Sequence, residues 1–257
     1  MISRMIQLDD FSIGFGSRLL LDHAEAAFAG GRLTALIGRN GTGKSTLLRA
    51  IAGLNRRYSG ELFLDGKRVR DLSPQESARV LAFVTTERTR IPSLRCEDVV
   101  SLGRAPYTNW IGSLQAADRE IVRNALASVG MEQYALRTMD TMSDGECQRI
   151  MIARALAQQT PVILLDEPTS FLDLPNRYEL CALLARLAHD EGKCILFSTH
   201  ELDVAIQTCD GIALIDDGKI CHLPVGEMIA SGHIQRLFKI SNVPAGISVR
   251  PDIHEEN

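Results

Sequence analysis

A glycine-rich stretch in the first fifth of the chain restricts the fold more than any other feature. It has the G-x-x-x-x-G-K-S spacing of a phosphate-binding loop and comprises Gly38, Arg39, Asn40, Gly41, Thr42, Gly43, Lys44 and Ser45. Such a loop lies between a strand and a helix, because the helix N-terminus and successive backbone N–H groups together bind phosphate oxygens. The apolar run 32–37 and the helical pattern 45–54 supply both elements. We therefore expect Lys44 to reach the terminal phosphates of a nucleotide and Ser45 to hold Mg²⁺.

Apolar runs later in the chain predict a parallel sheet. Residues 162–165 and 194–197 are short and continuously apolar, as in strands that are buried on both faces. Residues 176–189 have helical periodicity, which completes a βαβ unit. Asp-Gly turns within 60–67 and 211–219 predict antiparallel hairpins at the margins of this core. The segment between the phosphate loop and the later strands is mostly helical in pattern and predicts an insertion.

Two carboxylates, Asp166 and Glu167, follow the apolar run 162–165 directly. The carboxyl ends of parallel strands form the crevice where α/β proteins bind ligands. We expect Asp166 to take part in a Mg²⁺ site and Glu167 to orient or deprotonate an attacking water. A solvated acidic turn is an equally common origin of such a pair in isolation, and the phosphate loop upstream favours the catalytic interpretation.

The segment 142–149 precedes a predicted helix and contains Ser143 and Glu146 at the S-x-x-E spacing of a capping box. A capped helix N-terminus is also a place where an anion binds, so the structural and the functional interpretation are compatible. His200 follows another apolar run. Alone it indicates no more than a polar strand end.

Composition and charge disfavour some classes of protein. The formal net charge of −4 and the pI of about 5.9 provide no basic surface for nucleic acid, so we expect no nucleic-acid partner. No segment approaches the roughly 20 apolar residues that a membrane-spanning helix needs. The first ten residues do not have the pattern of a signal peptide. If the protein works at a membrane, we expect other chains to form the pore.

Taken in order, these motifs resemble the nucleotide-binding domain of ABC transporters over about residues 7–226. The resemblance implies an α/β fold, namely a P-loop NTPase (RecA-like) core with an antiparallel β subdomain and an inserted α-helical subdomain. We expect a single ATPase domain over residues 1–257, with the helical subdomain at 92–159 and a C-terminal tail at 227–257.

The resemblance also implies roles for individual residues. Glu167 and His200 would be catalytic, Ser45 and Asp166 would hold Mg²⁺, and Asp173 would couple two ATP sites. ATP would be bound by three segments, which are the aromatic Phe15 against adenine, the loop 38–45 with Thr46, and the signature motif Ser143, Asp144, Gly145 and Glu146.

The sequence departs from the family pattern at two places. The usual signature reads L-S-G-G-Q, so Asp144 and Glu146 replace a glycine and a glutamine and bring carboxylates close to a polyphosphate. This change predicts weaker dimer closure. The family's Q-loop glutamine, which binds Mg²⁺, is missing, and we expect Thr86 or Glu87 to take over its contact.

One phosphate loop and one signature in a single chain imply a homodimer with two equal sites. Each ATP would then lie between the loop of one copy and the signature of the other. The other implied partners are transmembrane permease subunits and, indirectly, a substrate-binding protein. The chain would be peripheral at the cytoplasmic face of the membrane.

Residues 103–107 read Gly-Arg-Ala-Pro-Tyr and are similar to a G-R-x-P-Y stretch in the ATPases of iron-siderophore, haem and cobalamin importers. A helix end stopped by Pro106 explains the same residues structurally. The ATP-site motifs also leave open a metal-ion importer or an exporter. A soluble ABC ATPase of DNA repair or translation would need a coiled-coil insertion or a second cassette, and the signature-like segment disfavours a P-loop small-molecule kinase.

Overall fold

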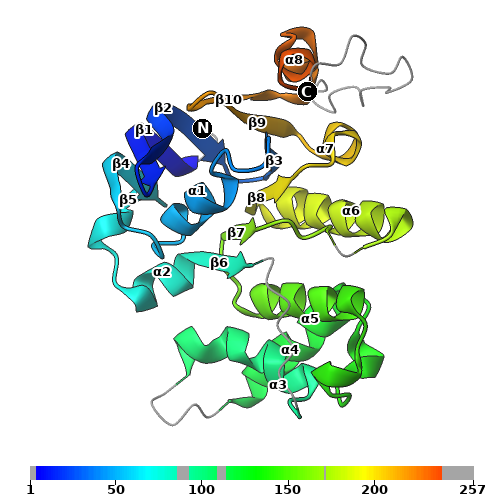
Figure 1. The fold of residues 1–257 in the computed structure, drawn as a ribbon. Coiled ribbons are helices and arrows are strands. Elements are labelled where there is room, and N and C mark those ends of the chain that lie inside the picture. The colour runs from blue at the N-terminus through cyan, green and yellow to red at the C-terminus, as the bar shows by residue number, and fades with distance from the viewer. Residues whose placement is uncertain (1–3, 86–92, 109–113, 171, 239–257) are drawn as a thin grey trace, which may run out of the picture.

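The computed structural model describes residues 4–85, 93–108, 114–170 and 172–238, and two β-sheets form its framework (Figure 1). The strands of the larger sheet are β3 (Arg32–Gly38), β6 (Leu81–Val84), β7 (Val162–Leu165), β8 (Cys194–Thr199), β9 (Gly211–Asp216) and β10 (Lys219–Pro224). Their order is β10-β9-β3-β8-β7-β6. All neighbours pair in parallel except β10, which is antiparallel to β9.

The parallel pairing brings the ends of β3, β7 and β8 to one edge of the sheet. Every residue of β7 and β8 is buried, which confirms the prediction of strands covered on both faces. Ile37 of β3 pairs with Thr199 of β8, and Leu165 of β7 pairs with Phe197 of β8. The residues that follow these strands therefore meet at the same edge.

The smaller sheet is antiparallel and has the order β2-β1-β4-β5. Its strands are β1 (Arg4–Phe15), β2 (Arg18–Ala29), β4 (Tyr58–Leu64) and β5 (Lys67–Arg68). The sequence pattern did not predict β1 and β2. Their pairing shifts register at several points, including Leu8 to Phe11, so the apolar side chains do not keep a regular two-residue period.

Both predicted Asp-Gly hairpins are present. Asp65 and Gly66 connect β4 to β5 with φ values of 48° and 74°, and Asp217 and Gly218 connect β9 to β10 with φ values of 44° and 74°. Positive φ at both central residues is what a type I′ turn requires, and Asp-Gly tolerates it well.

Nine α-helices lie in the described part of the chain. They are α1 (Lys44–Ile51), α2 (Pro74–Val80), α3 (Cys96–Ser101), α4 (Ala116–Ser128), α5 (Asp144–Ala157), α6 (Leu174–Glu191), α7 (Leu202–Thr208), α8 (Val225–Ala230) and α9 (His233–Phe238). Short 3₁₀ segments are η1 (Val69–Asp71), η2 (Leu102–Tyr107), η3 (Glu132–Tyr134) and η4 (Met139–Thr141). Helices α3, α4 and α5 come between β6 and β7 in the chain and form a group on the side of the molecule away from the smaller sheet (Figure 1).

The predicted helices at 45–54 and 176–189 are confirmed with shifted ends. Helix α6 begins earlier than predicted because Asp173 caps its N-terminus and Pro175 is tolerated in the first turn. It ends at Gly192, which has a φ of 67° and serves as a left-handed C-cap.

The core has two parts, one on each face of the larger sheet. Leu33, Ala35 and Ile37 of β3 contribute to the part that α5 and α6 cover, whereas Leu36 contributes to the part that contains α1 and the smaller sheet. This division follows from the alternation of side chains along a strand. Strand β3 is therefore packed on both faces, which fixes the start of the loop that follows it.

Candidate functional site

The phosphate loop connects β3 to α1 through backbone conformations that require glycine. Gly43 has a φ of 103° and is the N-cap of α1. A Cβ atom at Gly38 would lie 2.6 Å from Thr42 Oγ1 and 2.8 Å from the Ile215 carbonyl oxygen. The loop is thus packed against β9 and opens directly into a helix N-terminus, which is the arrangement that binds phosphate.

Lys44 is folded into this loop. Its Nζ donates to the Gly38 carbonyl oxygen at 2.9 Å and lies 3.4 Å from that of Arg39. Burial lowers the pKa of Lys44, and the nearby carboxylates of Glu167 and Asp166 oppose that shift. The ammonium group is therefore held in a desolvated position, where a phosphate would be a strong partner.

Ser45 and Asp166 meet as the sequence predicted. Ser45 Oγ donates to Asp166 Oδ1 at 3.0 Å, and Asp166 is almost completely buried. A hydroxyl and a carboxylate are the hard oxygen ligands that Mg²⁺ prefers, and Mg²⁺ commonly completes its shell with waters and phosphate oxygens. Among the described residues, no group of three or more His, Cys, Asp or Glu side chains is placed so that it could hold a metal ion.

Ser198 is a residue of this site that sequence reasoning missed. Its Oγ donates to Asp166 Oδ1 at 2.6 Å and accepts from the Glu167 backbone N–H at 2.9 Å. Ser198 therefore fixes both carboxylate-bearing residues at the end of β7. Its place two residues before His200, at the end of an adjacent parallel strand, was the available signal.

Glu167 and His200 lie side by side at the ends of β7 and β8. Glu167 Oε1 is 4.0 Å from His200 Nδ1, and the Glu167 side chain is partly exposed whereas that of His200 is exposed. Glu167 has a φ of 47°, an unfavourable value for a non-glycine residue. Such strain persists only where the surroundings enforce it, and the bond from its N–H to Ser198 is one such restraint.

The signature segment forms the predicted capping box at the start of α5. Glu146 N–H donates to Ser143 Oγ at 3.3 Å, and Glu146 Oε2 accepts from the Ser143 N–H at 2.8 Å. Hydrogen bonds from the Ser143 N–H and from Ser143 Oγ to the Glu146 carboxylate hold the pKa of Glu146 below its usual value. Asp144 and Gly145 form the first turn and are partly exposed. Figure 1 shows α5 well apart from α1, so the chain does not bring its own signature to its own phosphate loop.

The tip of the β1–β2 hairpin lies beside the phosphate loop. Phe15 pairs with Arg18 across the turn, and Arg18 Nη1 is 3.8 Å from the position of a Cβ atom at Gly41. The Phe15 side chain is 76% exposed. An exposed aromatic ring next to this loop is available to stack on a base.

The remaining predicted site residues take less constrained places. Arg39 and Asn40 are exposed at the loop, and Thr46 is partly exposed on α1. Asp173 is the N-cap of α6 and accepts from the Asn176 N–H at 3.1 Å. Thr86 and Glu87, which were expected to replace the missing glutamine, lie outside the described residues.

The Gly-Arg-Ala-Pro-Tyr stretch forms most of η2, with Gly103 and Arg104 buried and Ala105 and Tyr107 exposed. Arg104 is buried, forms a 2.9 Å ion pair with Asp118, and donates to the Ala157 carbonyl oxygen at 2.8 Å. Tyr107 lies with its ring 4.3 Å from the Arg104 guanidinium and donates to the Gln158 carbonyl oxygen at 3.0 Å. These contacts connect η2 to α4 and to the end of α5, which supports the structural explanation of the motif.

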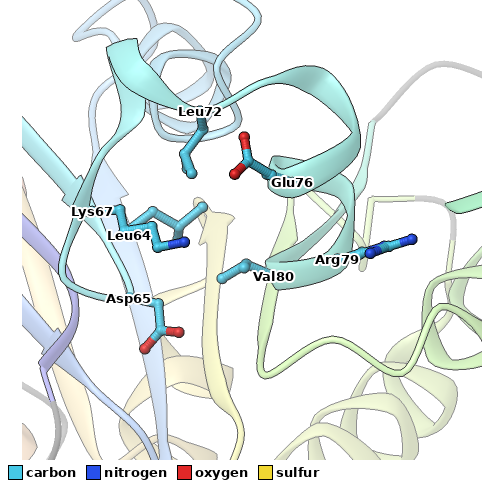
Figure 2. Close-up of a pocket in the computed structure, with 7 residues that line it drawn as sticks. All are labelled: Leu64, Asp65, Lys67, Leu72, Glu76, Arg79 and Val80. Atoms are coloured by element: carbon cyan, nitrogen blue, oxygen red, sulfur yellow. The ribbon is translucent and has the colours of Figure 1, made fainter.

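A small hollow of about 190 Å³ lies between the β4–β5 hairpin and α2 (Figure 2). It is lined by Leu64, Asp65, Lys67, Leu72, Glu76, Arg79 and Val80. None of these belongs to the predicted nucleotide site. The phosphate loop offers backbone N–H groups on an open surface, so a deep cavity is not expected in a single copy.

Comparisons with known proteins agree with this geometry. A family described as ABC transporter matches residues 21–170. The chain is 36% identical over 200 residues to the iron(3+)-hydroxamate import ATP-binding protein of Bacillus subtilis. This alignment covers 78% of this chain and 74% of that protein. It is 37% identical over 205 residues to the cobalamin import ATP-binding protein of Halobacterium salinarum. This alignment covers 80% of this chain and 51% of that protein.

Solved structures give the same result. A metal-chelate type ABC transporter in an inward-facing conformation matches with a TM-score of 0.81 and 25% identity over 92% of this chain and 89% of that one. A dimeric ATP-binding cassette with ADP and phosphate, in a post-hydrolysis state, matches with a TM-score of 0.75 and 27% identity. The match covers 86% of this chain and 99% of that one. The described helices include none long and apolar enough to cross a membrane. The fold, the phosphate loop and these matches together show that the chain belongs to the ABC transporter family of ATPases.

Proposed function

We propose that this chain is the ATP-hydrolysing subunit of an ABC importer for iron-siderophore complexes, haem or cobalamin. The observation that carries hydrolysis is the convergence of Lys44, Ser45, Asp166, Glu167 and His200 at one edge of the sheet. The cargo class is supported by relatives whose names state hydroxamate, siderophore and cobalamin import.

The arrangement suits phosphoryl transfer to water, a reaction in which positioning and electrostatics supply most of the catalysis. Lys44 and the backbone N–H groups of the loop would hold the terminal phosphates. Ser45 and Asp166 would hold Mg²⁺, which neutralises developing charge on the phosphate oxygens. Glu167 would orient and deprotonate the attacking water, and His200 would contact the γ-phosphate.

The site of one copy is incomplete, which supports a homodimer. Ser143 is the N-cap of α5 and Gly145 is in its first turn, and α5 lies apart from α1 (Figure 1). A second copy would bring its signature across an interface to each loop, as the dimeric cassette similar to this chain suggests. Permease subunits would form the membrane pore, and the ATPase dimer would bind them at the cytoplasmic face, with a substrate-binding protein delivering cargo.

Hydrolysis is tested first with the purified chain. Glu167→Gln keeps the shape of the side chain but removes the base, so kcat should fall by about 100-fold or more while ATP binding persists. The variant should also accumulate as a dimer in ATP, visible by size-exclusion chromatography. Glu132→Gln, at an exposed position in η3, is the matched control. An active Glu167→Gln protein would remove Glu167 from this role.

Cargo is tested by uptake in cells that lack the chain and receive either the wild type or Glu167→Gln. Radiolabelled ferric siderophore, haem and cobalamin are supplied separately. The wild type should restore uptake of at least one label, and Glu167→Gln should restore none. If the wild type restores none of the three, the cargo class is wrong even if hydrolysis has been confirmed.

A further inference from the structure

Glu201 is a buried carboxylate that the proposed hydrolysis does not use. It follows His200 directly, and its side chain is only 7% exposed. Its backbone N–H donates to Thr199 Oγ1 at 3.0 Å, which fixes the turn between β8 and α7. Because burying a carboxylate without a counter-charge is unfavourable, its partner determines how this turn is held.

The partner is Arg177, in the first turns of α6. Its Nη1 is 2.9 Å from Glu201 Oε1, and its Nε donates to the Leu172 carbonyl oxygen at 2.8 Å. The contact with Glu201 is an ion pair, since neither carboxylate oxygen receives a well-aligned hydrogen bond from a described residue. One guanidinium therefore connects the segment before α6 to the turn that carries His200. The planar fork of arginine makes two such contacts at once, whereas lysine carries one charged nitrogen.

Leu172 in turn contacts the signature segment of the same chain. Its Cδ2 lies 3.0 Å from the position of a Cβ atom at Gly145. Beside it, Arg149 of α5 donates to Asn176 Oδ1 at 2.7 Å and to Glu179 Oε2 at 2.9 Å. The N-terminus of α6 thus has contacts with the start of α5 on one side and with Glu201 on the other, and Figure 1 shows α6 between α5 and α7.

We propose that Arg177 is a positioning residue for ATP hydrolysis, which holds His200 in a fixed relation to the signature segment through Glu201 and Leu172. The proposal rests on the function proposed above. In that function the signature serves the ATP of the second copy, whereas His200 serves the ATP of its own copy. Through the contacts of Arg177, the placement of His200 depends on the placement of the signature segment in the same chain.

A purely structural role predicts a different result from a positioning role, and a double substitution separates them. Arg177→Met leaves the Glu201 carboxylate buried without its counter-charge, so it should lower Tm as well as kcat. Arg177→Met combined with Glu201→Met replaces both charges by apolar side chains and should restore Tm. Since the connection to His200 is still missing, kcat should stay low.

The experiment measures Tm, the Kd for ATP, and the kcat and KM of ATP hydrolysis in the purified full chain. In the double variant we expect Tm close to that of the wild type, a Kd within about twofold, and a kcat lower by about tenfold or more. Arg177→Lys keeps a charge but makes fewer contacts, so its kcat should lie between that of the wild type and that of the double variant. Arg186→Met, at an exposed position on the same helix, should match the wild type throughout.

Wild-type kcat in the double variant would overturn the proposal, as would a loss of kcat fully explained by a lower folded fraction. A Kd for ATP that weakens in proportion to the loss of kcat would also contradict it, because the described contacts of Arg177 are with Leu172, Asp173 and Glu201 and not with the phosphate loop. Failure of the proposed function is recognised separately, by absence of hydrolysis in the wild-type chain.

Discussion

Lys44 shows how a single residue prepares the site at a cost to the free protein. Its ammonium group is largely desolvated and is held by the carbonyl oxygens of its own loop. Because burial lowers its pKa, folding disfavours its charged form. The penalty applies at pH values below the folded pKa and is relieved as the pH rises above it. A bound polyphosphate removes this penalty by supplying opposite charge.

Lys44→Met should therefore lose ATP binding without losing stability. Without nucleotide, its Tm should equal or exceed that of the wild type, since an apolar chain of similar length replaces the buried charge. ATP at 100 times its Kd stabilises a protein by about 2.7 kcal/mol. That energy corresponds to roughly 5–10 °C in a chain of this size. The wild type should show this shift in a thermal melt, and Lys44→Met should not.

Lys67→Met is the control for this substitution, because Lys67 is exposed on β5 and lies outside the nucleotide site. It should keep the full ATP-dependent shift in Tm. An ATP shift of normal size in Lys44→Met would show that Lys44 does not contact the phosphates.

At the scale of the element, α5 and α2 begin with the same capping box. Ser73 and Glu76 bond to each other in α2 as Ser143 and Glu146 do in α5. In both boxes the serine hydrogen bonds lower the pKa of the glutamate. Of these two helices, α5 is the one that begins with the segment proposed as the signature. The chain therefore contains its own control for separating a cap from a functional contact.

Glu146→Gln and Glu76→Gln should have similar effects on stability. A depressed folded pKa means that each glutamate contributes stability above its unfolded value of 4.5, and that this is lost as the pH falls through the folded value. At pH 7 each variant should have a slightly lower free energy of unfolding than the wild type, because an acidic side chain stabilises a helix N-terminus. Urea titrations from pH 7 towards pH 3.5 should show the difference from the wild type shrinking.

Their effects on hydrolysis should differ. Glu146→Gln restores the glutamine that the family signature usually has and removes a negative charge near the γ-phosphate, so kcat should rise by about twofold. Glu76→Gln should leave kcat unchanged. An equal change in both variants would mean that the effect comes from helix capping alone.

At the scale of the whole molecule, local patterns predicted elements, whereas contacts between distant residues had to be observed. The phosphate loop and the apolar runs predicted β3, β7 and β8 and so the meeting of Ser45 with Asp166, which are 121 positions apart. The strand end before His200 indicates that Ser198 lies near this edge of the sheet, but the sequence does not indicate that Ser198 bonds to Asp166, or that Arg177 pairs with Glu201. Such pairs depend on which strands and helices become neighbours, and that is a property of the folded topology.

Asp144 replaces a glycine that the family signature usually has. We expect this replacement to weaken closure of the dimer. Asp144 is in the first turn of α5, where the helix dipole favours an anion, and its own carboxylate competes there with an incoming phosphate. In a Glu167→Gln background, Asp144→Gly should increase the ATP-dependent dimer, with an apparent dissociation constant lower by about threefold or more at low salt.

Asp71→Gly, an equal change of charge at an exposed position in η1, should have no such effect. Sedimentation at two salt concentrations checks the cause, because a gain that comes from removed repulsion should shrink as salt screens the charges. An equal or weaker dimer in Asp144→Gly would show that Asp144 does not oppose closure.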